Sequence, residues 1–331
     1  MTVGGIDMQQ ELSTKQNFTK NRMNPQKKGF LWKVVQNRMF FPFLIPGVII
    51  ILINQYLPIF GILVAFKNIN YNDGIFKSPW VGTKNFEFLF ATKETWNILF
   101  RTVAYNLAFI FIGLIAAVAI AVAVNEIKNR HMSRFYQSAM ILPSFLSIVI
   151  VSYVVNSMLA TRAGVMNTSI LPILGIDPIQ WYTEPKYWPF ILPIVNIWKG
   201  AGIGSVYYLS AICGIDEELY QSAVIDGANK WQQIKYITVP FLLPMITIIT
   251  LLSLGGIIRA DFGLFYNVTL NNAMLYPTTD VLDTYVYRAL TRMNDVGMSS
   301  AASVFQSIAG SILIIAVNLG IKKIDPERSI F

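Results

Sequence analysis

The sequence has very little of what metal sites and disulfide-bonded folds require. Its 331 residues include one cysteine, Cys213, and one histidine, His131. A single cysteine excludes a disulfide within the chain, and the two residues leave no His/Cys cluster of the kind that binds zinc. We therefore expect this chain to bind no metal.

Charged residues are also scarce. They make up 13% of the chain, whereas hydrophobic residues make up 54%. This composition is too apolar for an ordinary soluble enzyme and indicates an integral membrane protein. The sequence also lacks a phosphate-binding G-x(4)-G-K-[ST] loop, an H-E-x-x-H zinc motif and a G-x-S-x-G nucleophile elbow. Nothing in it therefore predicts an enzyme or an ATPase.

Six apolar stretches are each close to the roughly 20 residues that a helix needs to cross a bilayer. They cover residues 40–66, 101–124, 135–159, 189–212, 239–258 and 302–321. We therefore predict an all-α integral membrane protein with six transmembrane helices. The long polar stretch before the first of them does not fit a cleavable signal peptide, so we expect that helix to remain in the mature chain.

The basic residues favour one orientation in the membrane. If the N-terminus is cytoplasmic, the inner segments hold 15 of the 26 Lys and Arg residues and the outer segments hold 9, while Arg101 and Lys199 lie within spans. This asymmetry is the positive-inside pattern, and it explains the net charge of +8 without a nucleic-acid partner. We expect a multi-pass protein of a bacterial cell membrane with both termini in the cytoplasm.

A short polar stretch between the fourth and fifth spans is the most informative segment. Asp216 is a candidate N-cap, and the acidic residues after it favour the positive end of a helix dipole. We predict one cytoplasmic coupling helix over residues 216–235. Gly227 would lie inside it at a cost of about 1 kcal/mol relative to alanine, which a close approach or a bend would justify.

The same stretch resembles the signature E-A-A-x(3)-G-x(9)-I-x-L-P of the permease subunits of ATP-binding-cassette importers. The residues in register with it are Ala223, Gly227, Ile237 and Pro240. The residues that depart from it are Gln221 in place of Glu, Ser222 in place of the first Ala and Val239 in place of Leu. The resemblance implies contact with a separate ATPase through Glu218, Tyr220, Gln221, Ser222, Ala223, Asp226, Gly227, Ala228 and Trp231.

Residues 260–318 are similar, more closely, to the polysaccharide branch of these permeases. The similarity lies in Gly263-Leu-Phe-Tyr266, in the run from Leu275 to Leu290, in Phe305-Gln-Ser307 and in Asn318. It implies the type I permease fold of these importers and an oligosaccharide or glycan substrate. The implied partners are a second, similar permease, two ATPase subunits that hold ATP and magnesium, an extracellular lipoprotein that binds the substrate, and membrane lipid. The chain itself is expected to bind no cofactor.

Under this resemblance the chain divides into five parts. They are a mobile cytoplasmic tail (1–28), an interfacial helix with the first transmembrane helix (29–66), an extracellular segment (67–99), a permease core with five transmembrane helices and the coupling helix 216–235 (100–323), and a cytoplasmic tail (324–331). In the outer segments of the core we expect a helix over residues 279–290. We also expect an interfacial aromatic belt of Trp181, Tyr182, Tyr187 and Trp188.

A path for sugars through the membrane needs hydrogen-bonding groups and aromatic faces inside the bundle. The candidates are Asn196, Trp198, Lys199, Tyr207 and Tyr208 on the fourth span, Tyr153 and Asn156 on the third, and Asn106 on the second. Lys199 stands out because a cation near the bilayer centre costs about 2.5–3.5 kcal/mol on insertion scales. It either faces the path or forms an ion pair or a hydrogen bond to helix carbonyls.

Two other classes of protein are compatible with a polytopic chain. An ion-coupled secondary sugar transporter needs no ATPase, but it usually carries carboxylates within its spans, and these six contain none. An intramembrane enzyme needs a nucleophile and a base in the spans, whereas His131 lies in a predicted cytoplasmic loop. The sequence therefore favours a permease in which partner ATPases drive alternating access.

Overall fold

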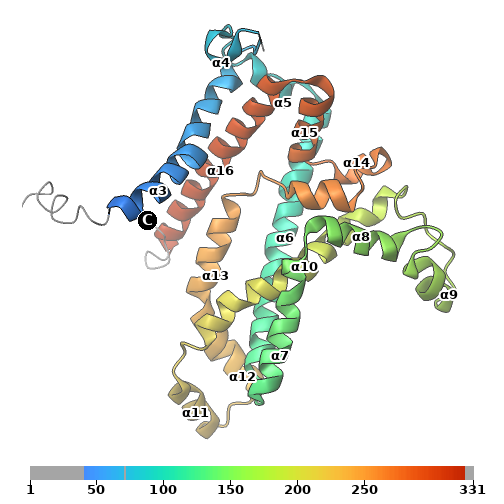
Figure 1. Ribbon diagram of the computed structural model, residues 1–331. Coiled ribbons are helices and arrows are strands. Elements are labelled where there is room, and N and C mark those ends of the chain that lie inside the picture. Colours follow the sequence, from blue (N-terminus) through green and yellow to red (C-terminus); the bar gives the residue numbers. More distant parts are fainter. Residues whose placement is uncertain (1–40, 71, 325–331) are drawn as a thin grey trace, which may run out of the picture. The chain divides into compact units, whose positions relative to one another are not determined.

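The computed structural model describes residues 41–70 and 72–324, and its regular elements are all helical, apart from one isolated bridge between Lys67 and Trp80. The chain forms two compact units, divided between Phe60 and Gly61. Figure 1 shows both units with their helices labelled. The predicted tail 1–28 and the predicted interfacial helix before residue 41 lie outside the described residues.

The described part of the first unit is a helical run. It begins as α3 (Phe41–Ile51), continues as the π-helix η2 (Leu52–Tyr56) and enters the 3₁₀-helix η3 (Leu57–Phe66). Pro46 lies inside α3, where proline supplies no backbone donor. The run from Pro42 to Phe66 is 25 residues long and apolar enough to cross a membrane, as predicted for the first span.

The second unit contains the remaining elements. Before the bundle come α4 (Gly74–Lys77), η4 (Lys84–Phe86) and α5 (Phe88–Ala91). The long helices are α6 (Lys93–Asn125), α10 (Trp188–Ile212), α13 (Val239–Leu254) and α16 (Val296–Ile324). Between them lie α7 (Arg130–Ile141), η5 (Leu142–Phe145), α8 (Ile148–Leu159), η6 (Met166–Ile170), α9 (Leu171–Ile173), η7 (Pro185–Tyr187), α11 (Glu217–Ile225), α12 (Lys230–Gln233), η8 (Ile234–Thr238), η9 (Leu264–Val268), η10 (Ala273–Leu275), α14 (Tyr276–Thr279) and α15 (Leu282–Met293).

Five helices of the described chain are long and apolar enough to span a membrane, and the count rises to six if one bent pair is a single span. This agrees with the six predicted spans, although the boundaries move. The second span begins at Lys93, not at residue 101, because the Thr92 hydroxyl caps the helix by accepting a hydrogen bond from the Thr95 amide at 3.2 Å.

The bent pair corrects the third predicted span. Residues 135–159 were expected to form one straight helix, but the helices Arg130–Phe145 and Ile148–Leu159 meet at 98°. Pro143 has no amide hydrogen to continue the helical ladder, and the Ser147 side chain accepts from the Val149 amide to start α8 anew. The region predicted as the third span therefore consists of two helices with a sharp bend between them.

The helices α6 and α10 pack closely along much of their length. A Cβ added at Gly204 of α10 would lie 3.4 Å from the Cβ of Ala117 on α6, so the two backbones lie close together. Around this contact Ala117, Tyr208 and Leu242 are buried, the last of them on α13. Small residues at the contact are what close helix packing in a membrane requires.

Of the four residues of the predicted aromatic belt, Trp188 is packed more tightly than an interfacial position would allow. Trp188 is fully buried, and its indole nitrogen donates to the Trp181 carbonyl at 2.8 Å. The Trp181 indole in turn donates to Oδ1 of Asn167 at 3.0 Å. Burial also raises the pKa of the Tyr182 phenol to about 12. The predicted belt is therefore wrong for Trp188, which belongs to a protein core together with Phe265 and Leu192.

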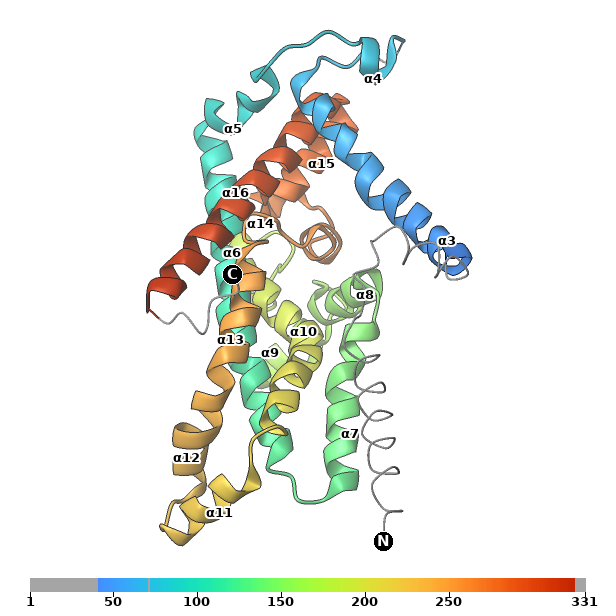
Figure 2. The same ribbon diagram turned by 90° about the vertical axis from the view of Figure 1, so that its left-hand side faces the viewer.

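The predicted helix over residues 279–290 exists but is shifted along the chain. α15 begins at Leu282 and ends at Met293, and α14 precedes it. The shift follows from the side chain of Thr284, whose hydroxyl accepts from the amide of Val281 at 3.1 Å and so fixes the start of α15. In Figure 2, α11 and α12 lie at one end of the second unit, and α14 and α15 lie well away from them, toward the other end.

Candidate functional site

The stretch between α10 and α13, residues 216–238, is called the polar segment below. Asp216 begins it as an N-cap, and its Oδ1 accepts from the amide of Glu218 at 3.0 Å. Glu217 and Glu218 occupy the first turn of α11, where carboxylates interact favourably with the helix dipole. This part of the prediction agrees with the structure.

The single coupling helix predicted over residues 216–235 is wrong, because Gly227 ends α11. Gly227 has φ +80°, a left-handed conformation that glycine adopts without strain. The amide of Ala228 donates to the carbonyl of Ala223 at 2.8 Å, and the amide of Gly227 donates to that of Val224 at 3.0 Å. These two bonds are the Schellman pattern of a helix C-terminus. Leu219 and Trp231, which the predicted helix would have contained, therefore lie on two different helices.

A second helix starts directly after this turn. The Asn229 side chain accepts from the Gln232 amide at 3.0 Å, and the Gln232 side chain accepts from the Asn229 amide at 2.7 Å, which together form a capping box. α12 then continues through the π-helix η8 into α13. The two halves of the polar segment therefore differ, since α11 is a separate helix and α12 extends the helical run of α13.

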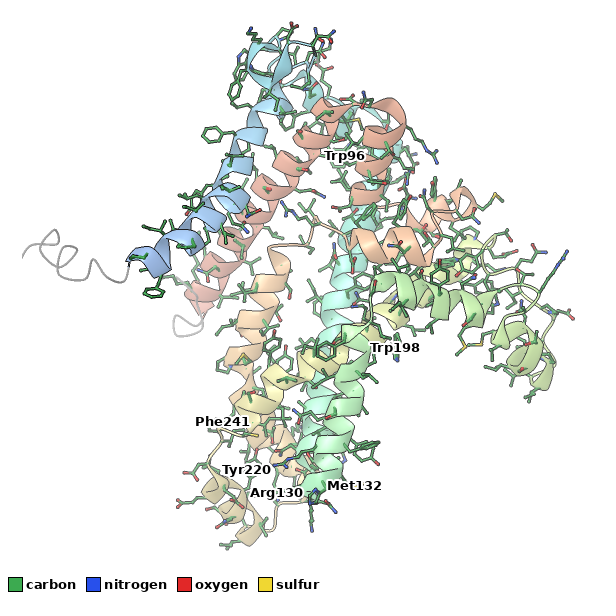
Figure 3. The ribbon with its side chains drawn as sticks, viewed as in Figure 1. Trp96, Arg130, Met132, Trp198, Tyr220 and Phe241 are labelled. Atoms are coloured by element: carbon green, nitrogen blue, oxygen red, sulfur yellow. The ribbon has the colours of Figure 1, made fainter. Side chains whose placement is uncertain are left out.

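The polar segment presents apolar side chains to solvent. α11 has no buried residue, and the side chains of Val224, Ile225 and Trp231 are 60%, 86% and 79% exposed. Isolated exposed apolar residues are common, but three of them on a short segment indicate a surface for another protein. Tyr220 is the exception, since it is half-buried and shares a hydrogen bond of 2.9 Å with the hydroxyl of Thr238. Figure 3 shows Tyr220 within the polar segment.

A second feature is a cavity of about 360 Å³ between α6, α10 and α13. Its polar lining comes from Asn106, Asn196, Tyr207, Tyr208, Thr250 and Ser253. Three glycines, Gly113, Gly200 and Gly204, also line it and leave the space open. No charged side chain is among the described residues that line the cavity, so its polar contacts are hydrogen bonds from amides and hydroxyls.

The structure brings together only some of the predicted path residues. Asn196, Tyr207 and Tyr208 line the cavity, whereas Trp198, Lys199, Tyr153 and Asn156 are not part of its lining. Positions 196, 200, 204 and 207 recur at helical spacing on one face of α10, and positions 198 and 199 lie on other faces. Trp198 is 45% exposed and Tyr153 is 71% exposed, and Figure 3 shows Trp198 part-way along α10.

Lys199 has a partner elsewhere. Its Nζ donates to the carbonyl of Ser144 at 3.4 Å, at the end of η5 where the third span breaks. A cation beside the free carbonyls of a helix C-terminus is stabilised by the helix dipole. Of the two interpretations given above, the structure therefore supports the hydrogen bond to a helix carbonyl over a position in this cavity.

Comparison with known proteins identifies the family. Residues 109–329 match the family described as "Binding-protein-dependent transport system inner membrane component".

The chain belongs to this family.

Two curated relatives from Bacillus subtilis (strain 168) match nearly its whole length. It is 29% identical to Protein LplB over 91% of this chain and 94% of the relative. It is 30% identical to the polygalacturonan/rhamnogalacturonan transport system permease protein YteP over 91% of this chain and 93% of the relative.

Solved structures agree with the family in fold. One is the crystal structure of a bacterial ABC transporter involved in the import of the acidic polysaccharide alginate, with a TM-score of 0.80, 30% identity, and coverage of 90% of this chain and 100% of the other. A structure of a bacterial alginate ABC transporter in complex with an alginate pentasaccharide-bound periplasmic protein gives a TM-score of 0.79 at 28% identity, over 89% of this chain and 98% of the other. The chain therefore has the permease fold of ABC importers.

Family membership also decides the class of protein. This permease is a multi-pass membrane subunit of an ABC importer, and the ATPase of such an importer is a separate subunit. The ion-coupled secondary transporter and the intramembrane enzyme are thereby set aside. Within the described residues no group of three or more His, Cys, Asp and Glu side chains is placed to hold a metal.

Sequence reasoning missed two kinds of residue at these sites. Thr250 and Ser253 line the cavity from α13, three positions apart on one face, and hydroxyls at that spacing in a span were the available signal. Val224 and Ile225 were missed because the family signature does not include these two positions, and apolar residue type does not indicate exposure. Asn106 was only a weaker candidate, yet its amide donates to the carbonyls of Ile257 and Arg259 at 2.8 and 2.9 Å beside the cavity.

Proposed function

We propose that this permease imports oligosaccharides, including fragments of polysaccharides. The observation that carries the proposal is the cavity of amides and hydroxyls between α6, α10 and α13 in a chain of this family. Sugar hydroxyls that leave water need such partners, and the ring of Tyr207, which is exposed, offers an apolar face for a sugar ring. The substrates named for YteP and for the two alginate transporters support the same substrate class.

The proposed importer contains the partner subunits that the family resemblance implies. This permease pairs with a second, similar permease, two ATPase subunits that hold ATP and magnesium, and an extracellular lipoprotein that delivers the glycan. The alginate transporter in complex with a pentasaccharide-bound periplasmic protein supports the last of these partners. Both termini lie in the cytoplasm in this proposal, as the distribution of Lys and Arg favours.

The polar segment is the proposed contact with the ATPase. Its residues are those named from the family signature, from Glu218 to Trp231, to which the exposed Val224 and Ile225 are added. α11 lies at the end of the second unit, beyond α13 (Figure 1), where a partner can reach it. ATP-driven closure of the ATPase pair would displace α11 and shift the permease between inward-open and outward-open states.

Uptake of labelled glycans tests the proposal. Cells with and without the gene are given a panel of labelled oligosaccharides together with a monosaccharide, an amino acid and a metal ion. We expect the loss of the gene to abolish uptake of at least one oligosaccharide and to leave the other substrates unchanged. Loss of amino-acid or metal uptake alone would contradict the proposed substrate class.

A further inference from the structure

The polar segment is connected to the transmembrane helices by two side-chain contacts. Lys230 is the first residue of α12, and its Nζ lies 2.9 Å from Oε2 of Glu126, the C-cap of α6. The hydroxyl of Tyr220 on α11 lies 2.9 Å from that of Thr238, next to the start of α13. The first contact therefore connects the segment to α6. The second lies within the segment and connects α11 to η8, which continues into α13.

The ion pair lies at a loosely packed place. A cavity of about 370 Å³ separates the ends of α6 and α10 from the polar segment, and its lining includes Glu126, Cys213, Tyr220 and Lys230. In a protein interior, the movement of one element displaces its neighbours because they are closely packed. The cavity interrupts that packing between the polar segment and the ends of α6 and α10. A side-chain bridge across the cavity is therefore well placed to make α6 follow a displacement of the polar segment.

The ion pair is poorly suited to a purely stabilising role. The side chains of Lys230 and Glu126 are 67% and 36% exposed. Ion pairs at such exposure contribute little to folding, because water and salt screen them. An exposed ion pair can nevertheless set the relative position of the two helices that it joins, because two like charges at these positions would repel each other.

We propose that Glu126 and Lys230 are a positioning pair that transmits movement of the polar segment to α6. This inference rests on the proposed function. α6 and α13 both line the cavity proposed for the glycan. In this proposal the Tyr220–Thr238 contact transmits the movement to the helical run of α13, and the Glu126–Lys230 pair transmits it to α6. Without the pair, displacement of α11 reaches α13 but leaves α6 behind, so that ATP hydrolysis continues while import falls.

Charge reversal in the complete importer, reconstituted in liposomes with its partner subunits, tests the pair. The variants are Glu126→Lys, Lys230→Glu and the double reversal. Lys128→Glu is the matched control, because Lys128 lines the same cavity and forms no ion pair within the described part of the chain. We expect each single reversal to lower glycan uptake per ATP hydrolysed by about threefold to tenfold. The double reversal should restore it to within about twofold, and the control should match the wild type.

A second readout does not depend on the substrate. Cys213, the one cysteine of this chain, is exposed and lines the same cavity, so its labelling by a maleimide, followed on this subunit, reports the cavity's geometry with and without ATP. We expect ATP to change the labelling rate in the wild type, the single reversals to abolish that change and the double reversal to restore it. A wild type that shows this change yet imports no glycan would contradict the proposed function and leave the pair supported.

Two outcomes would overturn the positioning pair. One is single reversals that match Lys128→Glu in both readouts. The other is a double reversal no better than the single ones, including a loss of ATPase co-purification that the double reversal does not restore. That second pattern would place the two side chains in the subunit contact itself.

Discussion

Gly227 matches the permease signature, but its structural role differs from the one expected from the sequence. The expectation was a glycine inside a helix, justified by a close approach of another segment or by a bend. In the structure a Cβ at Gly227 would meet no atom within 4 Å, but the residue has φ +80°. The requirement is therefore for a backbone conformation that ends α11, and not for space.

The effect of substituting Gly227 on coupled uptake should depend on how readily the new residue adopts the left-handed conformation, and not on the size of its side chain. The left-handed conformation costs a residue with a Cβ roughly 1–2 kcal/mol, whereas asparagine adopts it more readily. We expect glycan uptake per ATP to fall in the order Gly, Asn, Ala, Val. Uptake and ATPase rates of the four reconstituted importers check this order. Equal losses for Gly227→Asn and Gly227→Ala, or no loss in any variant, would contradict it.

Lys199 and Asn196 differ in surroundings although they lie on the same helix. Lys199 donates to the Ser144 carbonyl, whereas Asn196 lines the cavity. We expect Lys199→Met to destabilise the permease by about 1–2 kcal/mol, the range of a hydrogen bond from a charged group, while uptake per assembled importer stays near that of the wild type. Asn196→Leu should lower uptake and leave stability unchanged.

Thermal unfolding in detergent and uptake normalised to assembled importer distinguish the two roles. The expectation fails if Lys199→Met lowers uptake without lowering the unfolding temperature, because that result would return Lys199 to the substrate path.

Among the elements, the third span departs most from its prediction. The apolar run 135–159 is continuous, so hydropathy alone describes one straight helix. The break in this run follows from Pro143 and from the Ser147 cap of α8, and hydropathy takes no account of either. On one side of the break, α7 and η5 also pack against α10, which lies far away in the sequence. At Gly202 of α10, an added Cβ would lie within 3 Å of the Met140 carbonyl carbon and oxygen, so α10 approaches the α7 backbone there.

The pair Gly202→Ala and Gly200→Ala tests this contact. Both glycines lie in α10, but a Cβ at Gly200 meets no atom within 4 Å. Overpacking at Gly202 should destabilise the permease by about 1–3 kcal/mol, whereas Gly200→Ala should leave stability unchanged or raise it by about 0.5–1 kcal/mol. Thermal unfolding of the two variants measures the difference. Similar unfolding temperatures would mean that α7 and α10 are not in close contact here.

The elements were predictable where local chemistry decides them. Long apolar runs predicted the membrane-spanning helices, and Asp216 predicted the start of α11. Helix ends such as Gly227 and Thr92 required backbone conformation or capping bonds that a hydropathy pattern does not contain. Of the residues selected by type on α10, Asn196 and Tyr207 line the cavity whereas Trp198 and Lys199 do not, because the sequence does not show which face of α10 meets α6 and α13.

At the scale of the whole molecule, the orientation in the membrane stays a prediction. It is tested by cysteine labelling in a Cys213→Ala background. Thr183 is exposed in the segment before α10, and Lys322 is exposed near the end of α16. We expect a membrane-impermeant maleimide added to intact cells to label Thr183→Cys and not Lys322→Cys, because basic residues favour the cytoplasmic side. Labelling of Lys322→Cys alone would reverse the topology.

The central claim is that this permease couples ATP hydrolysis by partner subunits to the entry of an oligosaccharide. The most direct measurement is the accumulation of a labelled oligosaccharide in liposomes that contain the complete importer, with the binding lipoprotein and substrate on one side and ATP with magnesium on the other. We expect accumulation that requires ATP, is unaffected when proton and sodium gradients are collapsed, and is lost in importers that lack this chain. Accumulation driven by an ion gradient without ATP would contradict the claim.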